Sequence, residues 1–415
     1  MQRLLRTIVL AIAVTAPLAP RAQTPDELRQ DFDAAWRAAT DRYAYFDAKA
    51  TSWADIPALY AQELRQLSTR DDLVALLERV IDELCDPHAQ LNVNLASSFR
   101  LVPSGTDLWA EWRQGEALVT DVRVDSDAQR AGIRPNDVVV AIDGTPIADA
   151  VEARLGRSYP HSVAAARDWA LRAVLAGRHD ARRVLRVRQG EAIRTFELGA
   201  RDQFGARNPK PVGHSRIAGG IGVVRINDSL GDAATIQAFD RALDELGDTR
   251  GLIVDLRDTP SGGNSTVARG ILGRFVTRDL PYQRHLLPSE ERETGVRRSW
   301  LELVSPRGTT YRRPVAVLVG HWTGSMGEGL AIGFDATGAA TLVGTAMAGL
   351  LGATDRIVLP HTGIGLNLPT ERLYHVDGTP REAFRPRALV DVTKPAPDGD
   401  PFVAAALRVL ANRVE

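Results

Sequence analysis

The chain is poor in cysteine, in lysine and in net charge, and each shortage excludes a class of protein. Among its 415 residues Cys85 is the single cysteine, so the chain can form no internal disulfide. The formal net charge is −1 and the arginines are interleaved with acids, a pattern that indicates no nucleic-acid partner. No His, Cys and Asp cluster has structural-zinc spacing, and no Gly-Lys-Ser phosphate loop is present. We therefore expect no metal and no cofactor.

The N-terminus carries the pattern of an export signal. Residues 1–22 combine Arg3 and Arg6 with an apolar stretch over residues 7–16 and with small residues near Ala22. The apolar stretch is too short to span a bilayer comfortably, and its flanks are typical of a cleaved signal peptide. We expect a periplasmic or secreted mature chain with no stable membrane span.

The strongest local pattern lies in residues 314–334. A β-branched apolar run over residues 315–319 predicts a buried strand, residues 321–324 break it, and a helix begins at Ser325. A serine on such a strand-to-helix turn lies where helix-end N–H groups stabilise an oxyanion. Because Ser325 and Glu328 also match a capping box, a plain helix cap remains open as an alternative at this point.

A second segment, residues 251–275, repeats the layout of strand, glycine-rich turn and helix. Gly262 and Gly263 allow a sharp turn there whose N–H groups can face a neighbouring group. Together, DLRDTPSGGN and TGSMGEGLA resemble the motifs of the tail-specific, or C-terminal processing, serine proteases and their tricorn-core relatives. Residues 126–147 resemble a PDZ domain, the peptide-binding module of this family, and residues 378–392 are similar to its closing segment.

The resemblance implies Ser325 as the nucleophile, with oxyanion-hole N–H groups from Gly263 and Met326. The best-known branch of the family uses a lysine base in a T-x-G-K-G segment, but residues 344–356, the corresponding stretch, contain no lysine. Lysines occur only at positions 49, 210 and 394, where nothing promises the burial that a neutral lysine base needs. Another branch takes a histidine from a D-x-H motif, which here is residues 86–88. By resemblance we therefore expect His88 to be the base.

Other residues compete for roles at this site. Glu382 matches the glutamate of the closing family segment, which implies that it orients His88, although an exposed surface glutamate would look the same. Asp86 is a weaker alternative for orienting the ring. His321, four residues before Ser325, is a rival base. Cys85 raises the idea of a cysteine nucleophile, whereas an apolar cysteine at a helix end is usually part of the core.

The resemblance and the strand-helix alternation together predict an α/β fold with a crotonase-like βα core, an N-terminal helical region and an inserted PDZ-like, β-rich domain. We divide the chain into a signal peptide (1–22), a helical region carrying the His88 loop (23–100), a PDZ-like domain (101–202), a linker (203–212), a protease core (213–395) and a C-terminal tail with a helix (396–415). Within the PDZ-like domain we expect a helix over residues 160–177 and a hairpin over residues 182–198.

These expectations describe an exported serine endopeptidase acting on protein or peptide substrates. Its PDZ-like domain is expected either to bind substrate tails along a sheet edge or only to gate the active site. The alternative from another class is a catalytically inactive family member that binds peptides. The sequence does not predict an oligomeric state.

Overall fold

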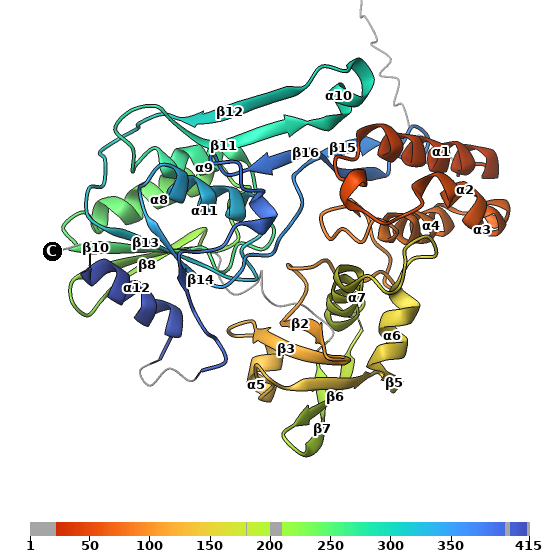
Figure 1. Ribbon diagram of the computed structural model, residues 1–415, viewed down its shortest axis with the longest axis horizontal. Coiled ribbons are helices and arrows are strands. Elements are labelled where there is room, and N and C mark those ends of the chain that lie inside the picture. Colours follow the sequence, from red (N-terminus) through yellow and green to blue (C-terminus); the bar gives the residue numbers. More distant parts are fainter. Residues whose placement is uncertain (1–21, 180, 200–209, 395–398, 413–415) are drawn as a thin grey trace, which may run out of the picture.

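The computed structural model describes residues 22–179, 181–199, 210–394 and 399–412. Residues 1–21 of the expected signal peptide and residues 203–209 of the expected linker lie outside these ranges. Within them, no helix combines the length and the apolarity needed to cross a bilayer. Figure 1 shows an N-terminal helical region at one end, a PDZ-like domain below it, and a large sheet-and-helix core at the other end.

The core is built on a six-stranded sheet in the order β17-β14-β13-β10-β9-β8. Its strands are β8 (Val212–Ile217), β9 (Ile221–Ile226), β10 (Gly251–Asp255), β13 (Val315–Val319), β14 (Thr341–Gly344) and β17 (Ala388–Leu389). All neighbouring strands pair in parallel except β8, which runs antiparallel to β9 at one edge. Every residue of β10 and β13 is buried, which explains why β13 and residues 252–254 of β10 are aliphatic throughout.

Helices cover both faces of this sheet, as expected for a βα core. Leu252 and Val254 face one apolar cluster, which contains residues of α8 (Ala234–Glu245), α9 (Ser265–Leu272) and α11 (Met326–Ala336). Ile253, between them, faces the opposite cluster, which contains residues of α12 (Pro401–Ala411). The predicted α/β core is confirmed, and its strands bring the two glycine-rich turns to one edge.

A second, five-stranded antiparallel sheet was not predicted. It contains β1 (Gln90–Leu91), β11 (Leu280–Leu287), β12 (Arg298–Val304), β15 (Ala353–Val358) and β16 (Gly365–Tyr374), and α10 (Pro288–Thr294) joins β11 to β12. Strand β1 pairs with β16 through Gln90 opposite Asn367 and Leu91 opposite Leu366. This pairing anchors the loop before β1 to the C-terminal half of the chain.

The N-terminal region is helical, as predicted. It comprises α1 (Pro25–Arg42), α2 (Ile56–Leu59), α3 (Ala61–Gln66) and α4 (Arg70–Asp82), with short 3-10 turns at Phe46–Ala48 and Trp53–Asp55. Thr24 and Thr69 begin α1 and α4 with capping boxes that satisfy the first N–H groups. The apolar faces of these helices share one core with Leu366 and Leu368 of β16. The region is therefore packed onto the second sheet.

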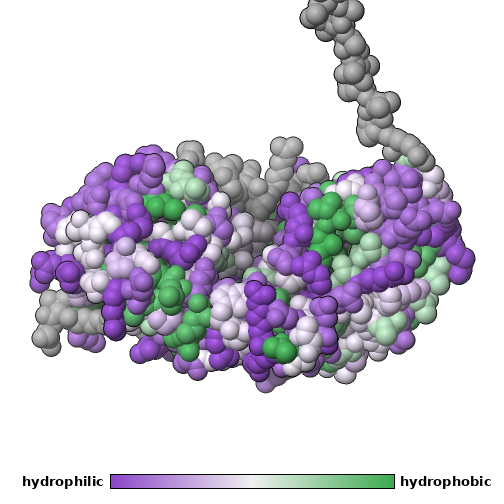
Figure 2. Space-filling model, turned by 90° about the horizontal axis from the view of Figure 1, so that it is seen from above, coloured by the Kyte–Doolittle hydropathy of each residue, from purple (hydrophilic) through white to green (hydrophobic). Residues whose placement is uncertain are grey.

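The PDZ-like domain is a small sheet in the order β2-β3-β4-β6-β7, with β5 paired to β4. Its elements are β2 (Leu108–Arg113), β3 (Glu116–Val122), α5 (Asp127–Ala131), β4 (Val138–Ile142), β5 (Thr145–Pro146), α6 (Ile147–Arg154), α7 (Ala164–Ala176), β6 (Arg183–Gln189) and β7 (Ala192–Leu198). The expected helix and hairpin are confirmed by α7 and by the β6-β7 pair. Figure 2 views the molecule from above, relative to Figure 1, and shows a face that is mostly polar, with its apolar residues in separate patches.

Candidate active site

The two glycine-rich turns lie side by side because the strands before them are neighbours. Strands β10 and β13 pair in parallel, and a further bridge joins Thr259 to Thr323 beyond their ends. The N–H of Thr259 donates to the Trp322 carbonyl, and the N–H of Gly324 donates to the Thr259 carbonyl, both at 3.2 Å. The turns therefore meet at the carboxyl edge of the sheet, where open α/β folds place their sites.

Ser325 occupies a strained turn between β13 and α11. Its φ of 49° and ψ of −112° are unusual for a residue with a side chain. Its Oγ is hydrogen-bonded to His88 Nε2 at 3.1 Å, and its N–H donates to Glu328 Oε2 at 2.9 Å. Glu328 thus does reach back as in a capping box, but the serine hydroxyl is engaged with the imidazole.

His88 is held by the loop that follows α4. Asp86 Oδ1 accepts the His88 N–H at 2.9 Å, and Asp86 Oδ2 accepts the Tyr43 hydroxyl at 2.7 Å. The other ring nitrogen, Nδ1, is 2.6 Å from the Leu351 carbonyl oxygen. Because a carbonyl only accepts, Nδ1 carries the proton and Nε2 is free to accept one from Ser325. Burial, followed by the charge of Arg381, lowers the pKa of His88, which keeps the ring neutral at neutral pH.

Two backbone N–H groups beside Ser325 are available to a ligand. Within the described residues, the N–H groups of Met326 and Gly263 donate to no acceptor. A β-carbon added at Gly262 would lie 2.9 Å from both Ser325 Oγ and the Met326 nitrogen. The space next to these atoms is therefore open only because residue 262 has no side chain. Gly262 also has a φ of +68°, which glycine adopts without strain.

Glu382 lies near this site without a hydrogen bond to the imidazole. It belongs to a 3-10 turn at Arg381–Ala383, and its Oε2 is buried without a hydrogen-bond partner in the described part of the chain. Burial raises the pKa of its carboxyl, and Asp86 is close enough to add to this shift. The ring nitrogen that Glu382 was expected to bind is bonded instead to the Leu351 carbonyl. Its orienting role stays a prediction.

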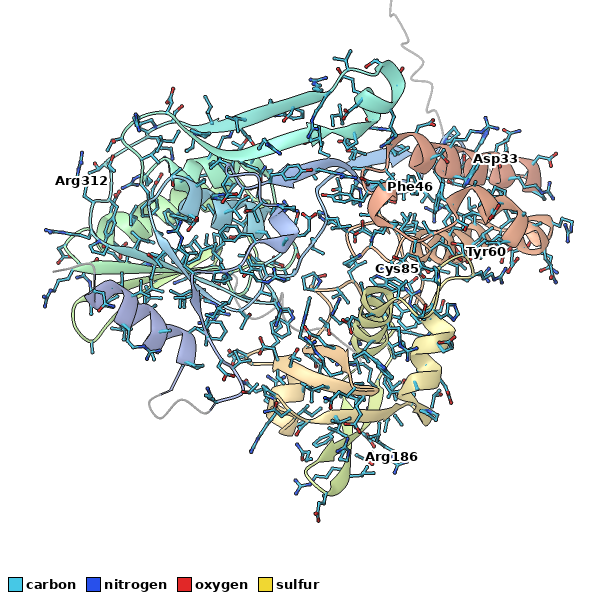
Figure 3. All side chains as sticks on the ribbon, in the orientation of Figure 1. Asp33, Phe46, Tyr60, Cys85, Arg186 and Arg312 are labelled. Carbon is cyan, nitrogen blue, oxygen red and sulfur yellow. The ribbon has the colours of Figure 1, made fainter. Side chains whose placement is uncertain are left out.

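The three competing residues have other surroundings. His321 stacks on Trp109 of the PDZ-like domain at 4.6 Å between ring centroids, and burial lowers its pKa to about 3. Asp86 binds the backbone of His88 and not its ring. Cys85 lies where the helical region meets the PDZ-like domain (Figure 3), and burial raises the pKa of its thiol to about 12. Its thiolate is therefore scarce at neutral pH.

The PDZ-like domain touches both turns. Arg123, at the end of β3, forms an ion pair with Asp258 of the first turn at 2.7 Å. Trp322 of the second turn donates its indole N–H to the Thr106 carbonyl at 2.8 Å. Both contacts are largely buried, so the position of this domain is tied to the segments that carry Gly263 and Ser325.

Sequence reasoning missed three groups at the site. These are the Leu351 carbonyl, the buried carboxylate of Glu328 and the buried guanidinium of Arg381. Glu328 was visible only as a helix cap, and a backbone carbonyl leaves no trace in residue type. The spacing of glycines around residue 351 is the one signal that the sequence offers for it.

Known proteins match the chain in the same three regions. The model of peptidase family S41 matches residues 220–385, that of the tricorn protease C1 domain residues 24–82, and that of the PDZ domain residues 118–163. The carboxy-terminal processing protease CtpB of Bacillus subtilis (strain 168) is 28% identical over 223 residues. That alignment covers 51% of this chain and 42% of CtpB, so it spans less than half the length of this relative.

Solved structures share the whole architecture. The photosystem II D1 C-terminal processing protease superposes with a TM-score of 0.56 at 18% identity, covering 92% of this chain and 97% of that chain. Mature CPAF superposes with a TM-score of 0.59 at 16% identity, covering 94% and 96%. These superpositions establish a shared fold, while the family models match the segments that carry the motifs. Together, the matched domains and these relatives support the tail-specific, or C-terminal processing, serine protease family, with residues 220–385 similar to peptidase family S41.

Proposed function

We propose that this protein is an exported serine endopeptidase that cleaves protein or peptide substrates with Ser325 as nucleophile and His88 as base. The observation that carries the proposal is the 3.1 Å contact between Ser325 Oγ and His88 Nε2, made by a serine on a strained strand-to-helix turn. Residues 237 positions apart meet here with the spacing that general-base activation of a hydroxyl requires.

Acylation follows from this geometry. Ser325 Oγ attacks the carbonyl carbon of the scissile bond while its proton moves to His88 Nε2. The N–H groups of Met326 and Gly263 donate to the developing oxyanion, with the N-terminal end of α11 adding a favourable dipole. Nε2 then gives its proton to the leaving amine as the C–N bond breaks. An ester between Ser325 and the acyl half of the substrate remains.

Deacylation repeats the steps with water. A water molecule attacks the ester carbonyl and passes a proton to Nε2, and that proton returns to Ser325 Oγ as the C–O bond breaks. The carboxylate product is released and the hydroxyl is restored. His88 begins each half-reaction neutral, consistent with its lowered pKa.

Export and tail recognition are separate parts of the proposal. The signal-peptide pattern of residues 1–22 supports a periplasmic or secreted location. The PDZ-like domain supports recognition of extended peptide segments, and its contacts to both turns equally support a gating role. Glu382, with a buried, unpartnered carboxylate oxygen near Asp86, is proposed to stabilise the charged imidazole once it has formed.

The test compares wild type with Ser325→Ala in two assays, labelling by a fluorophosphonate probe and cleavage of unstructured peptides. Ser299→Ala, which removes a hydroxyl on β12, is the matched control. We expect wild type and Ser299→Ala to be labelled and to cleave. Ser325→Ala should do neither, while its free energy of unfolding stays within about 1 kcal/mol of wild type. Cleavage by Ser325→Ala would exclude this nucleophile, and a folded but unreactive wild type would favour the peptide-binding alternative.

A further inference from the structure

A short irregular segment, residues 349–352, contacts both the ring of His88 and Glu328 in the first turn of α11. It connects β14 to β15 and contains two glycines in the left-handed region, Gly349 at φ +73° and Gly352 at φ +54°. Leu350, between them, is buried. The glycines let this backbone present polar groups in both directions without a regular strand.

The N–H side of the segment is bound by Glu328. One carboxylate oxygen accepts the Gly349 N–H at 2.9 Å, and the other accepts the Leu350 N–H at 3.2 Å. The second oxygen also accepts the N–H of Ser325 at 2.9 Å. The Glu328 carboxylate is fully buried and connects the nucleophile's own backbone to the segment.

The carbonyl side is bound by Arg381. Its Nη2 donates to the Leu350 carbonyl at 2.9 Å and to the Gly352 carbonyl at 2.7 Å. The Arg381 side chain is almost fully buried, and its nearest carboxylate is Glu328, at 3.9 Å. Glu328 therefore binds N–H groups of residues 349–352, and Arg381 binds carbonyl groups of the same segment.

Arg381 binds the carbonyls of Leu350 and Gly352, and the carbonyl of Leu351 lies between them along the chain. This carbonyl accepts from His88 Nδ1 at 2.6 Å. Because one Arg381 nitrogen binds the carbonyls of both Leu350 and Gly352, the backbone is held on each side of Leu351, and the direction of the Leu351 carbonyl is held with it. The tautomer of the base thus depends on the position of this segment.

We infer that Glu328 and Arg381 are positioning residues, which hold the Leu351 carbonyl so that His88 stays protonated at Nδ1 and presents Nε2 to Ser325. Their catalytic importance rests on the proposed function, because they act through His88 and Ser325. They touch no substrate atom in this scheme. A buried ion pair on its own contributes little net stability, so its value here lies in fixing one arrangement of the segment.

The first test compares Arg381→Met with Arg381→Lys. Methionine keeps the bulk but donates no hydrogen bond, whereas a single lysine ammonium can donate to both carbonyls, as the single Nη2 does. We expect Arg381→Met to lower kcat by about 10²-fold with little change in KM, the effect of misplacing a catalytic group, and Arg381→Lys to recover much of it. Arg183→Met, which removes a buried, ion-paired arginine from the PDZ-like domain, controls for loss of stability.

A second variant changes Glu328, which binds the N–H groups of the segment. Glu328→Gln keeps the shape of the side chain but turns one acceptor into a donor, which faces either the Gly349 N–H or those of Ser325 and Leu350. Because it is isosteric, it serves if Arg381→Met does not fold. A kcat within twofold of wild type in a folded Glu328→Gln would overturn the inference.

The deciding readout is the ring N–H proton of His88, observed by NMR with 15N-labelled histidine and assigned with His88→Gln. A hydrogen-bonded, buried Nδ1–H gives a slowly exchanging signal. We expect this signal in wild type, Arg183→Met and Arg381→Lys, and its loss in Glu328→Gln and Arg381→Met. It needs no turnover, so it tests the positioning even if the protein cleaves nothing. An unchanged signal in the folded variants would overturn the inference.

Discussion

The two strand-turn-helix units of the core share one local design and use it differently. In one, β10 leads through Gly262 and Gly263 to α9, which begins after Asn264. In the other, β13 leads through Gly324 to α11, which begins after Ser325. The strands are parallel neighbours and both helices lie on the same face of the sheet. A difference between the turns therefore reflects the residues at the helix start and not the scaffold.

That difference is the backbone conformation of the capping residue. Asn264 is extended, with φ −127° and ψ 157°, and its side-chain oxygen accepts the Val267 N–H at 3.1 Å. Ser325 has a positive φ, and its hydroxyl is bonded to His88 instead. The glutamate three residues later binds the Ser325 N–H. The extended Asn264 caps its helix with its side chain, whereas the strained Ser325 places its hydroxyl against the imidazole of His88.

The largest expected effect is the loss of turnover when His88, the proposed base at the second turn, is removed. His88→Ala should lower kcat/KM by about 10²- to 10⁴-fold, because in the described part of the chain no other acceptor is hydrogen-bonded to Ser325 Oγ. The matched control replaces Lys49, Lys210 and Lys394 together with arginine and should stay near wild-type turnover. Peptide hydrolysis measured at saturating and limiting substrate checks both. Loss of activity in the lysine variant alone would restore a lysine base.

Filling the first turn should damage the chemistry of the second. In Gly262→Ala the new β-carbon would lie 2.4 Å from Ser325 Cβ and 2.9 Å from the Met326 nitrogen, in the space next to the expected oxyanion donors. We expect kcat to fall by about 10²- to 10³-fold, the usual effect of losing an oxyanion-hole donor. Gly338→Ala is the control, because its φ is also positive and its β-carbon would meet nothing within 4 Å. Equal losses in both variants would point to backbone strain alone.

The pH profile should report the environment of His88. Burial lowers the pKa of this histidine below its ordinary value of about 6.5, and only the neutral ring accepts the serine proton. Thus kcat/KM should rise with pH along an acidic limb with a midpoint below about 6.5, set by His88, while the buried Glu328, whose pKa burial raises to about 7, should add a smaller rise near pH 7. His88→Gln should lose this acidic limb, and a midpoint well above 7 would contradict the neutral, buried base.

The α/β class of the core and the positions of its two glycine-rich turns could be predicted from the sequence. Ser325, Gly263 and Met326 could be placed because strand, glycine turn and helix start are written in contiguous residues. His88 lies 237 positions from Ser325, and only the resemblance of residues 86–88 to a family motif linked them. His88 is brought to Ser325 by the pairing of β1 with β16. The two residues of β1 are too few to show a periodic pattern, so this pairing could not be predicted from the sequence.

The remaining features depend on tertiary packing. Strand β11 escaped prediction because its burial does not alternate along the sequence, and β12 because Leu301 and Leu303 are exposed while Glu302 between them is partly buried. His321 looked like a rival base from its position near Ser325, yet its ring stacks against Trp109 from another domain. The Leu351 carbonyl has no side-chain signature at all, since every residue carries a carbonyl. Such groups are found only once the chain is folded.

The smallest predicted effect tests the first turn directly. Asn264→Ala removes the side-chain acceptor of the Val267 N–H, so the free energy of unfolding should fall by about 1 kcal/mol, as for other helix caps. Turnover should change by no more than a few fold, because the Asn264 side chain is not bonded to Ser325 or His88. Asn264→Asp, which retains an acceptor, should recover most of the stability. Urea unfolding and peptide hydrolysis on the same preparations measure the two quantities.

Ser325→Ala should show the opposite division, with turnover lost and stability nearly kept. If Asn264→Ala instead abolished turnover at unchanged stability, the assignment of capping to one turn and catalysis to the other would be wrong.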